Sequence, residues 1–302
     1  MLIRRRVGLE ITARAVRVAV VRRLARGAWV HCYHEAGLEP GVFVPSWEQE
    51  NISDEEAFRR SLRQALEAAG VRQAPVRLVL PDVTARLRIL ESERPPGARG
   101  PLHEYFTWRL RDDCLPAATL LAPAFYMNGH PTRGYVAMLV AAEAAIAQVQ
   151  RLTRAAGADP ARITSVGAAL FDLLGPGPAG REAKTEAFLV VAGSSASLIL
   201  TSDGAPIFAR TFPSTRERAL VPEAAADIAR DVAATIDYCL ERDTNPPDRI
   251  LLAGDCAHAP GLADALAQHL GLPCHLAEPN VHLLGHGRVP PEAIGAIAAA
   301  LY

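Results

Sequence analysis

The stretch VGLEITARAVRVAVV, residues 7–21, decides the fold, because it predicts two strands joined by a short turn. The first strand is apolar, and the valines of the second alternate with Arg17 and Ala19. A period of two residues is typical of a strand that buries one face, so we expect a half-buried second strand. The turn, Thr12-Ala13-Arg14-Ala15, contains no glycine.

Composition narrows the class of protein. The chain has 302 residues, of which 50% are hydrophobic and 22% are charged, enough for two packed domains or one large one. A net charge of −1 argues against a general nucleic-acid binder. The most apolar window, residues 136–147, is interrupted by Glu143, and no signal peptide is visible, so we expect a cytoplasmic protein without a membrane span. Five scattered cysteines suggest reduced thiols.

The first half of the chain continues with a helix and a strand. Ser53 and Glu56 predict a capping box that begins a helix over residues 53–69, and a strand follows at 75–82. Residues 83–160 then predict a β-α-β-β-α order, with a helix at 102–115, which can form a small inserted subdomain.

The second half repeats the opening pattern beyond a glycine- and proline-rich linker at 175–185. Three strands are followed by a long helix at about 218–242, and further strands and helices lead to an alanine-rich helix at 291–301. Two halves of similar order predict an internally duplicated α/β protein with two lobes around a cleft.

Four segments in this order resemble the PilM-like family of type IV pilus assembly proteins, which belongs to the actin-like ATPase superfamily. They are VGLEITARAVRVAVV (7–21), LVLPDVTARLRILE (78–91), residues 135–174 and residues 246–279. The resemblance implies an actin-like, ribonuclease-H-like fold with two duplicated lobes and a subdomain inserted in the first. We therefore expect residues 1–82 in the first lobe, to which 161–178 and the closing helix 287–302 return, an inserted subdomain at 83–160, and a second lobe at 179–286.

The family carries three nucleotide loops, and this sequence departs from each. In the first, a Gly-x-Asp-x-Gly pattern has become Gly8-Leu9-Glu10-Ile11-Thr12, with Arg14 in the turn. A phosphate loop depends on backbone N–H groups that no Cβ shields, so the loss of a glycine removes close approach.

In the second loop, Val191 stands where an aspartate would serve a metal or activate water, and Gly193, Ser194 and Ser197 follow. In the third loop, only Gly254 remains of the glycines that cup the adenosine. The resemblance therefore implies a degenerate ATPase site without catalytic residues and, at most, weak binding of ATP and Mg²⁺. The candidate nucleotide-binding residues are Glu10, Thr12, Arg14, Gly193, Ser194, Ser197 and Gly254.

Two other kinds of site receive less support from the sequence. The histidines and cysteines of the second half fit no standard zinc spacing, so we expect no metal site. The serines at 194–195 are not part of a Gly-x-Ser-x-Gly nucleophile motif.

The resemblance implies a non-catalytic scaffold of the pilus platform, cytoplasmic and peripheral to the inner membrane through its partners. In the family, the short cytoplasmic tail of a PilN-like single-span protein lies between the first lobe and its insert. Other platform or motor proteins are further expected partners. Two alternatives stay open: a nucleotide-regulated switch or weak ATPase, and the cytoplasmic domain of a type II secretion L-type protein.

Overall fold

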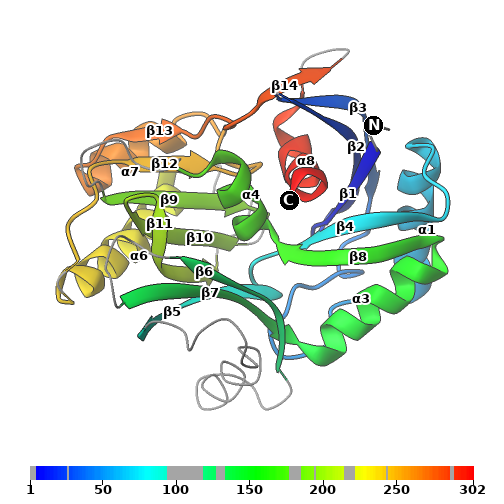
Figure 1. Cartoon of the computed structure of the whole chain (residues 1–302), viewed down its shortest axis with the longest axis horizontal. Helices are drawn as coiled ribbons and strands as arrows, with labels where there is room; N and C mark the ends of the chain where they lie inside the picture. Colours follow the sequence, from blue (N-terminus) through cyan, green and yellow to red (C-terminus); the bar gives the residue numbers. More distant parts are fainter. Residues whose placement is uncertain are drawn as a thin grey trace.

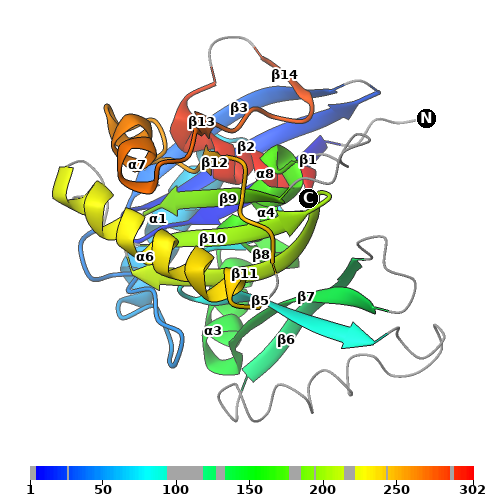
Figure 2. The ribbon, with the colours of Figure 1, turned by 90° about the vertical axis from the view of Figure 1, so that its left-hand side faces the viewer.

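A computed structural model describes residues 5–25, 27–93, 118–126, 133–176, 185–193, 195–213, 222–242, 244–285 and 289–302. Three β-sheets with helices on their faces make up this part of the chain (Figure 1). Two larger sheets form the cores of two lobes, and a three-stranded sheet lies beside them (Figure 2).

The two larger sheets share one topology. The first has the order β14-β3-β2-β1-β4-β8 and the second β11-β10-β9-β12-β13. In each sheet, the first two strands form an antiparallel hairpin, and the third strand pairs antiparallel with the second. Two further strands run parallel to the first strand and extend the sheet on the opposite side. The predicted duplicated α/β fold is confirmed by this repeated order. The strands are β1 (Arg5–Ile11), β2 (Ala15–Leu24), β3 (Gly27–Gly37), β4 (Ala74–Leu80), β8 (Ala158–Ser165), β14 (His282–Gly285), β9 (Thr185–Ala192), β10 (Ser195–Ser202), β11 (Ala205–Pro213), β12 (Ile250–Ala253) and β13 (Cys274–Leu276).

Helices cover both faces of the first sheet. On one face, α1 (Glu55–Ala68) and α3 (Glu143–Ala155) complete a core with alternate residues of β1, β2 and β4. On the other, the 3₁₀ helix η1 (Pro291–Ala293) leads into α8 (Ile294–Leu301), whose alanines are buried. The expectation of a half-buried second strand is therefore wrong: residues 15–21 of β2 are buried on both faces, and Arg17 is 2% exposed.

Close approach between α8 and β1 depends on two glycines. A Cβ atom built at Gly8 would lie 1.9 Å from the carbonyl oxygen of Ala296, and one at Gly295 would lie 2.3 Å from a carboxylate oxygen of Glu10. The helix therefore rests directly on the strand that carries Glu10.

The second sheet packs against α6 (Pro222–Leu240) and α7 (Leu262–Leu270), which fill one of its faces with apolar side chains. Between the lobes lies α4 (Val166–Leu174), where Phe171 meets Phe188 of β9 edge-to-face at 5.5 Å between ring centroids. The two lobes thus share an apolar cluster with α8.

The third sheet has the order β5-β7-β6, with β5 (Ala85–Glu93), β7 (Arg133–Ala142) and β6 (Ala118–Tyr126). Leu87 and Ile89 of β5 pack, with Ala209 of β11, against the cluster that the lobes share. The expected helix at 102–115 lies outside the described residues, as does most of the linker at 175–185.

Local details differ from the sequence expectations at two places. Helix α1 is capped by Asp54, whose Oδ1 accepts a hydrogen bond from the Ala57 N–H at 2.9 Å, while Ser53 instead donates to the carbonyl of Gly41. Residues 282–285 form a parallel strand on β3 that the sequence did not indicate. Among the helices of the described ranges, none is long and apolar enough to cross a membrane.

Candidate functional site

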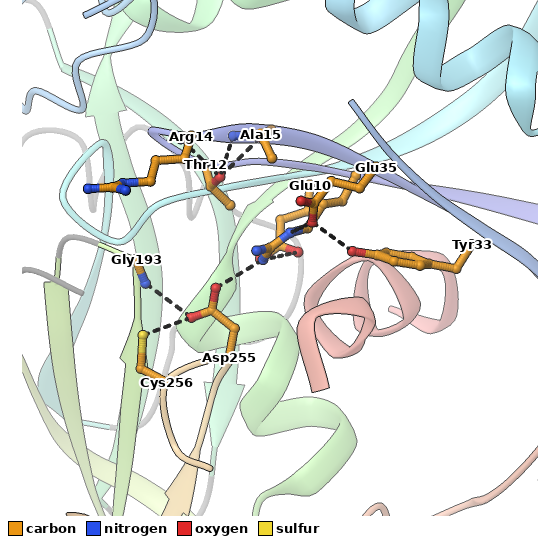
Figure 3. Close-up of polar contacts among 10 residues, drawn as sticks. Glu10, Thr12, Arg14, Ala15, Tyr33, Glu35, Gly193, Asp255 and Cys256 are labelled. Carbon is orange, nitrogen blue, oxygen red and sulfur yellow. Dashed lines mark hydrogen bonds and ion pairs between the residues drawn. The ribbon is translucent and has the colours of Figure 1, made fainter. Parts of the chain in front are cut away.

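The β1–β2 hairpin closes its turn with its own side chain. The Thr12 hydroxyl accepts hydrogen bonds from the N–H groups of Ala15 at 2.9 Å and Arg14 at 3.3 Å. It also donates to the carbonyl of Ala15 at 3.0 Å. Because these bonds are internal, two N–H groups that a phosphate loop would direct at an anion are already engaged. Arg14 is exposed and points away from Glu10 and Asp255 (Figure 3).

A buried arginine lies below this turn. Arg17 of β2 donates from Nη1 to a carboxylate oxygen of Asp255 at 3.0 Å, and the same nitrogen lies 3.5 Å from a carboxylate oxygen of Glu10. Its Nε donates to Glu35 at 2.8 Å. The Tyr33 hydroxyl donates to the same oxygen of Glu35 at 2.9 Å. One cation therefore joins three carboxylates, which we call the Arg17 cluster: Arg17, Glu10, Glu35 and Asp255.

Asp255 enters this cluster from the second lobe, on the loop after β12, and points toward the β1–β2 hairpin (Figure 3). Its other oxygen, Oδ1, accepts hydrogen bonds from the N–H of Gly193 at 3.2 Å and from the thiol of Cys256 at 3.3 Å. A single carboxylate thus connects strand β2 of the first lobe with Gly193 of the second loop and with the third loop, on which Asp255 itself lies.

Burial sets the charges of the cluster. Burial raises the pKa of Glu10 to about 7; the cation of Arg17 opposes this shift, and the neighbouring Asp255 adds to it. Burial lowers the pKa of Arg17, but Glu10 and Asp255 outweigh it, so the net shift is upward and the guanidinium stays charged. At neutral pH the cluster therefore holds a permanent cation between carboxylates of two lobes.

A small cavity remains beside the cluster. It is lined by Glu10, Ile11, Thr12, Ala13, Pro81, Val166, Ala192, Gly193 and Asp255, and its volume of about 10 Å³ is comparable to that occupied by one water. The structure therefore brings three of the candidate residues, Glu10, Thr12 and Gly193, together around this cavity.

The remaining predicted residues lie elsewhere. Ser197 of β10 shares a hydrogen bond with Thr211 at 3.0 Å and does not line the cavity. Gly254 has φ +104°, and a Cβ there would lie 2.3 Å from the carbonyl oxygen of Val191, so this glycine permits the loop to approach β9. Ser194 lies outside the described residues.

Sequence reasoning missed the two residues that dominate this site. The alternation with valines assigned Arg17 to an exposed face, and Asp255 was not among the candidate residues. A signal for Arg17 existed: it is the one charge within residues 15–21, a run otherwise of valine and alanine. No sequence signal pairs it with a residue 238 positions away.

A buried aspartate holds the first lobe to α4. Asp82, 2% exposed, accepts the N–H of Gly167 at 2.9 Å, and a Cβ at Gly167 would lie 2.7 Å from its carboxylate. Burial raises the pKa of Asp82, and hydrogen bonds from Ser165, Gly167 and Ser197 oppose that shift. Within the described residues, no group of three His, Cys, Asp or Glu side chains is arranged to hold a metal ion.

Comparison with known proteins gives structural matches only. No family model matches the sequence, and no curated protein matches it. A solved PilM–PilN type IV pilus biogenesis complex contains a chain that is 17% identical, with a TM-score of 0.74, over 98% of this chain and 97% of that one. The ethanolamine utilization protein EutJ from Carboxydothermus hydrogenoformans is 10% identical, with a TM-score of 0.54, over 99% and 89% of the two chains.

A third match is a protein from Bacteroides thetaiotaomicron with an actin-like ATPase fold and unknown function. It is 8% identical, with a TM-score of 0.50, over 98% of this chain and 96% of that one. These likenesses show that the chain has the actin-like ATPase fold, and the chain of the PilM–PilN complex matches that fold over 98% of this chain.

Proposed function

We propose that this chain is a non-catalytic scaffold of a type IV pilus assembly platform, which binds the cytoplasmic tail of a PilN-like membrane protein. The observation that carries the proposal is the similarity, over nearly the full length of both chains, to a protein solved in a PilM–PilN complex. Because the match covers nearly the full length of both chains, both lobes and the insert have counterparts in the matched chain.

The Arg17 cluster supports the absence of catalysis. A nucleotide needs N–H groups free to bind phosphate and a carboxylate placed to hold Mg²⁺. Here the donors of Arg14, Ala15 and Gly193 are engaged by Thr12 and Asp255. Val191 is apolar and 1% exposed at the position where the resemblance requires an aspartate. The residues present therefore do not fit Mg-ATP.

The boundary between the first lobe and the insert supports binding of an extended tail. Strand β8 is the edge of the first sheet, and β6 is an edge of the third sheet, within the described part of the chain. Strands β6 and β8 are in contact with each other. An edge strand offers unpaired backbone groups to an extended peptide, which can add as a further strand.

Binding of such a tail would place the chain on the cytoplasmic face of the inner membrane. In that position the second lobe remains available to other platform or motor proteins. The scaffold role then consists of holding a rigid two-lobed body against a membrane partner.

A peptide titration tests the proposal. The probe is a synthetic peptide of the N-terminal cytoplasmic tail of a PilN-like single-span protein from the same organism, and a scrambled peptide is the control. We expect micromolar binding of the tail alone by calorimetry, with slower hydrogen exchange in β6 and β8. Edge strand β13 of the second lobe provides the internal control and should not change. Equal binding of both peptides would overturn the tail-binding role.

Titration of Mg-ATP against the same preparation tests the non-catalytic part. We expect no heat of binding at micromolar nucleotide and no phosphate release. Micromolar binding would instead support a nucleotide-regulated switch.

A further inference from the structure

Four arginines form a row across neighbouring strands of the first sheet, which we call the arginine row: Arg23 (β2), Arg6 (β1), Arg77 (β4) and Arg162 (β8). Arg77 and Arg162 are cross-strand partners, and Arg77 is paired with Gly8 on its other side. Cross-strand partners share a face, and so do alternate residues of one strand.

The face is the one that α8 covers. Val21 and Val79, two positions from Arg23 and Arg77, belong to the cluster that contains α8, and Gly8, two positions from Arg6, touches that helix. The arginine row therefore continues the α8 face to the end of the sheet where β1 begins and β2 ends.

The end of α8 positions the two inner arginines. Arg77 donates from Nη1 to the carbonyls of Ala300 at 3.0 Å and Tyr302 at 2.8 Å, and Arg6 donates to that of Leu301 at 3.3 Å. These bonds use the partial negative charge of a helix C-terminus, near the C-terminal label in Figure 1. They hold the inner guanidinium groups in place.

The outer arginines, Arg23 and Arg162, are exposed. Within the described residues, neither lies in an ion pair. The nearby acid is Asp172 of α4, whose pKa burial raises and Arg23 lowers. Burial lowers the pKa of Arg77, and so do the neighbouring cations Arg6, Arg162 and Arg23, which is the effect of a local positive field.

This field is local, because the net charge of the whole chain is −1. Exposed Arg5 and Arg72 lie at the same end of the sheet, at the start of β1 and just before β4. The cations named here at this end are arginines, whose planar guanidinium groups bind phosphate oxygens in pairs.

We propose that the arginine row docks the protein on an anionic phospholipid bilayer. Four neighbouring strands at about 4.8 Å spacing spread the row over about 15 Å. Within the described residues, the cavity next to the Arg17 cluster contains none of these arginines. A spread, shallow set of cations suits a surface with many phosphate groups better than one enclosed phosphate or a narrow peptide.

The proposal rests in part on the proposed function, since a tail-bound platform component works beside the inner membrane. Each arginine close to an anionic leaflet improves binding about five-fold. The row alone thus gives a weak, salt-sensitive contact, which becomes effective once the membrane partner raises the local concentration.

Vesicle co-sedimentation of the purified chain tests the proposal. The two probes are vesicles of phosphatidylcholine alone and vesicles of phosphatidylcholine and phosphatidylglycerol in equal parts. We expect binding only to the second kind, lost at high salt. The double variant Arg23→Gln/Arg162→Gln should bind about twenty-five-fold less. Arg23→Lys/Arg162→Lys, which keeps the charges, should retain most of the binding.

The matched control is Arg60→Gln/Arg63→Gln, which removes the same charge from exposed positions of α1. It should bind as the wild type does. Equal loss in this control, or equal binding to both vesicles, would overturn the proposal. Tighter binding of an oligo-glutamate peptide than of vesicles, abolished by Arg23→Gln/Arg162→Gln, would assign the row to an acidic protein instead. Because the vesicles contain no partner and the tail titration contains no lipid, either proposal can fail alone.

Discussion

Arg17 Nη1 lies 3.0 Å from a carboxylate oxygen of Asp255, and this pair connects the two lobes. Both side chains are buried, with exposed fractions of 3% and 6%. The pair lies between the hairpin turn and the second lobe. An internal cation thus stands among carboxylates that would otherwise repel one another, and it links the two lobes.

The first prediction concerns Asp255→Ala. This change removes one counterion of a buried guanidinium and the acceptor of the Gly193 N–H. We expect the free energy of unfolding in urea to fall by about 3 kcal/mol, because loss of one partner leaves a buried charge less compensated. The control is Glu56→Gln, which breaks the exposed pair with Arg59 and should cost less than about 1 kcal/mol. Equal effects would show that Asp255 does not hold the lobes.

The second prediction concerns the pH dependence that Glu10 contributes. Its pKa rises from 4.5 to about 7 on folding, so the folded state binds a proton that the unfolded state releases. The stability from this group is therefore fully present below 4.5 and is lost as the pH rises through about 7.

Glu10→Gln, which carries no titrating proton, should become more stable relative to the wild type over that range. The relative gain is about 3 kcal/mol. Urea unfolding of both proteins across the same pH range measures it. A difference that stays constant with pH would contradict the assigned shift.

The fold was predictable from the sequence because local patterns of hydrophobic residues indicate its strands and helices. Alternating and apolar runs at 7–21 and 187–204 indicated the two hairpins, and the order of the following elements indicated the duplication. The site was predictable only in part. Glu10, Thr12 and Gly193 lie in segments that the family pattern marks, whereas the role of Arg17 depends on α8 covering its face and on a loop 238 residues away.

The third prediction concerns the N-terminus of α1, where the sequence alone also did not identify the residue that caps the helix. Ser53 and Asp54 are both good capping residues, and in the structure Asp54 caps the helix while Ser53 bonds to the carbonyl of Gly41. Asp54→Ala should therefore cost about 1 kcal/mol of unfolding free energy. Asp54→Asn, which keeps an oxygen acceptor, should restore most of it. A larger loss from removing the Glu56 carboxylate would favour the capping box instead.

The fourth prediction concerns Gln148 of α3, which fastens the segment before α1. Its Oε1 accepts the N–H groups of Asn51 and Ile52, both at 3.0 Å, and its Nε2 donates to the carbonyl of Ile52 at 2.8 Å. Gln148→Leu would leave these buried groups without partners and should cost about 3 kcal/mol.

Hydrogen exchange at Asn51 and Ile52 should accelerate in Gln148→Leu. The matched control is Gln64→Leu on the exposed face of α1, which should change stability by less than about 0.5 kcal/mol. Unchanged exchange at residues 51–52 would show that the segment is held by other contacts, such as the hydrogen bond between Thr84 and Asn51.

The last prediction tests the contact between α8 and β1. In Gly8→Ala the new methyl group would lie 1.9 Å from the carbonyl oxygen of Ala296 and 2.6 Å from the backbone nitrogen of Ala300. Both are backbone atoms of a helix, so no side chain can rotate away and α8 itself must move. We expect a loss of about 3 kcal/mol, at the upper end for overpacking. Gly37→Ala, at the end of β3, has nothing within 4 Å of the added carbon and should be neutral or slightly stabilising.

Because α8 also borders Glu10, Gly8→Ala should perturb the Arg17 cluster. A double variant with Asp255→Ala should therefore lose less unfolding free energy than the sum of the two single losses. Strict additivity would mean that α8 and the cluster act independently.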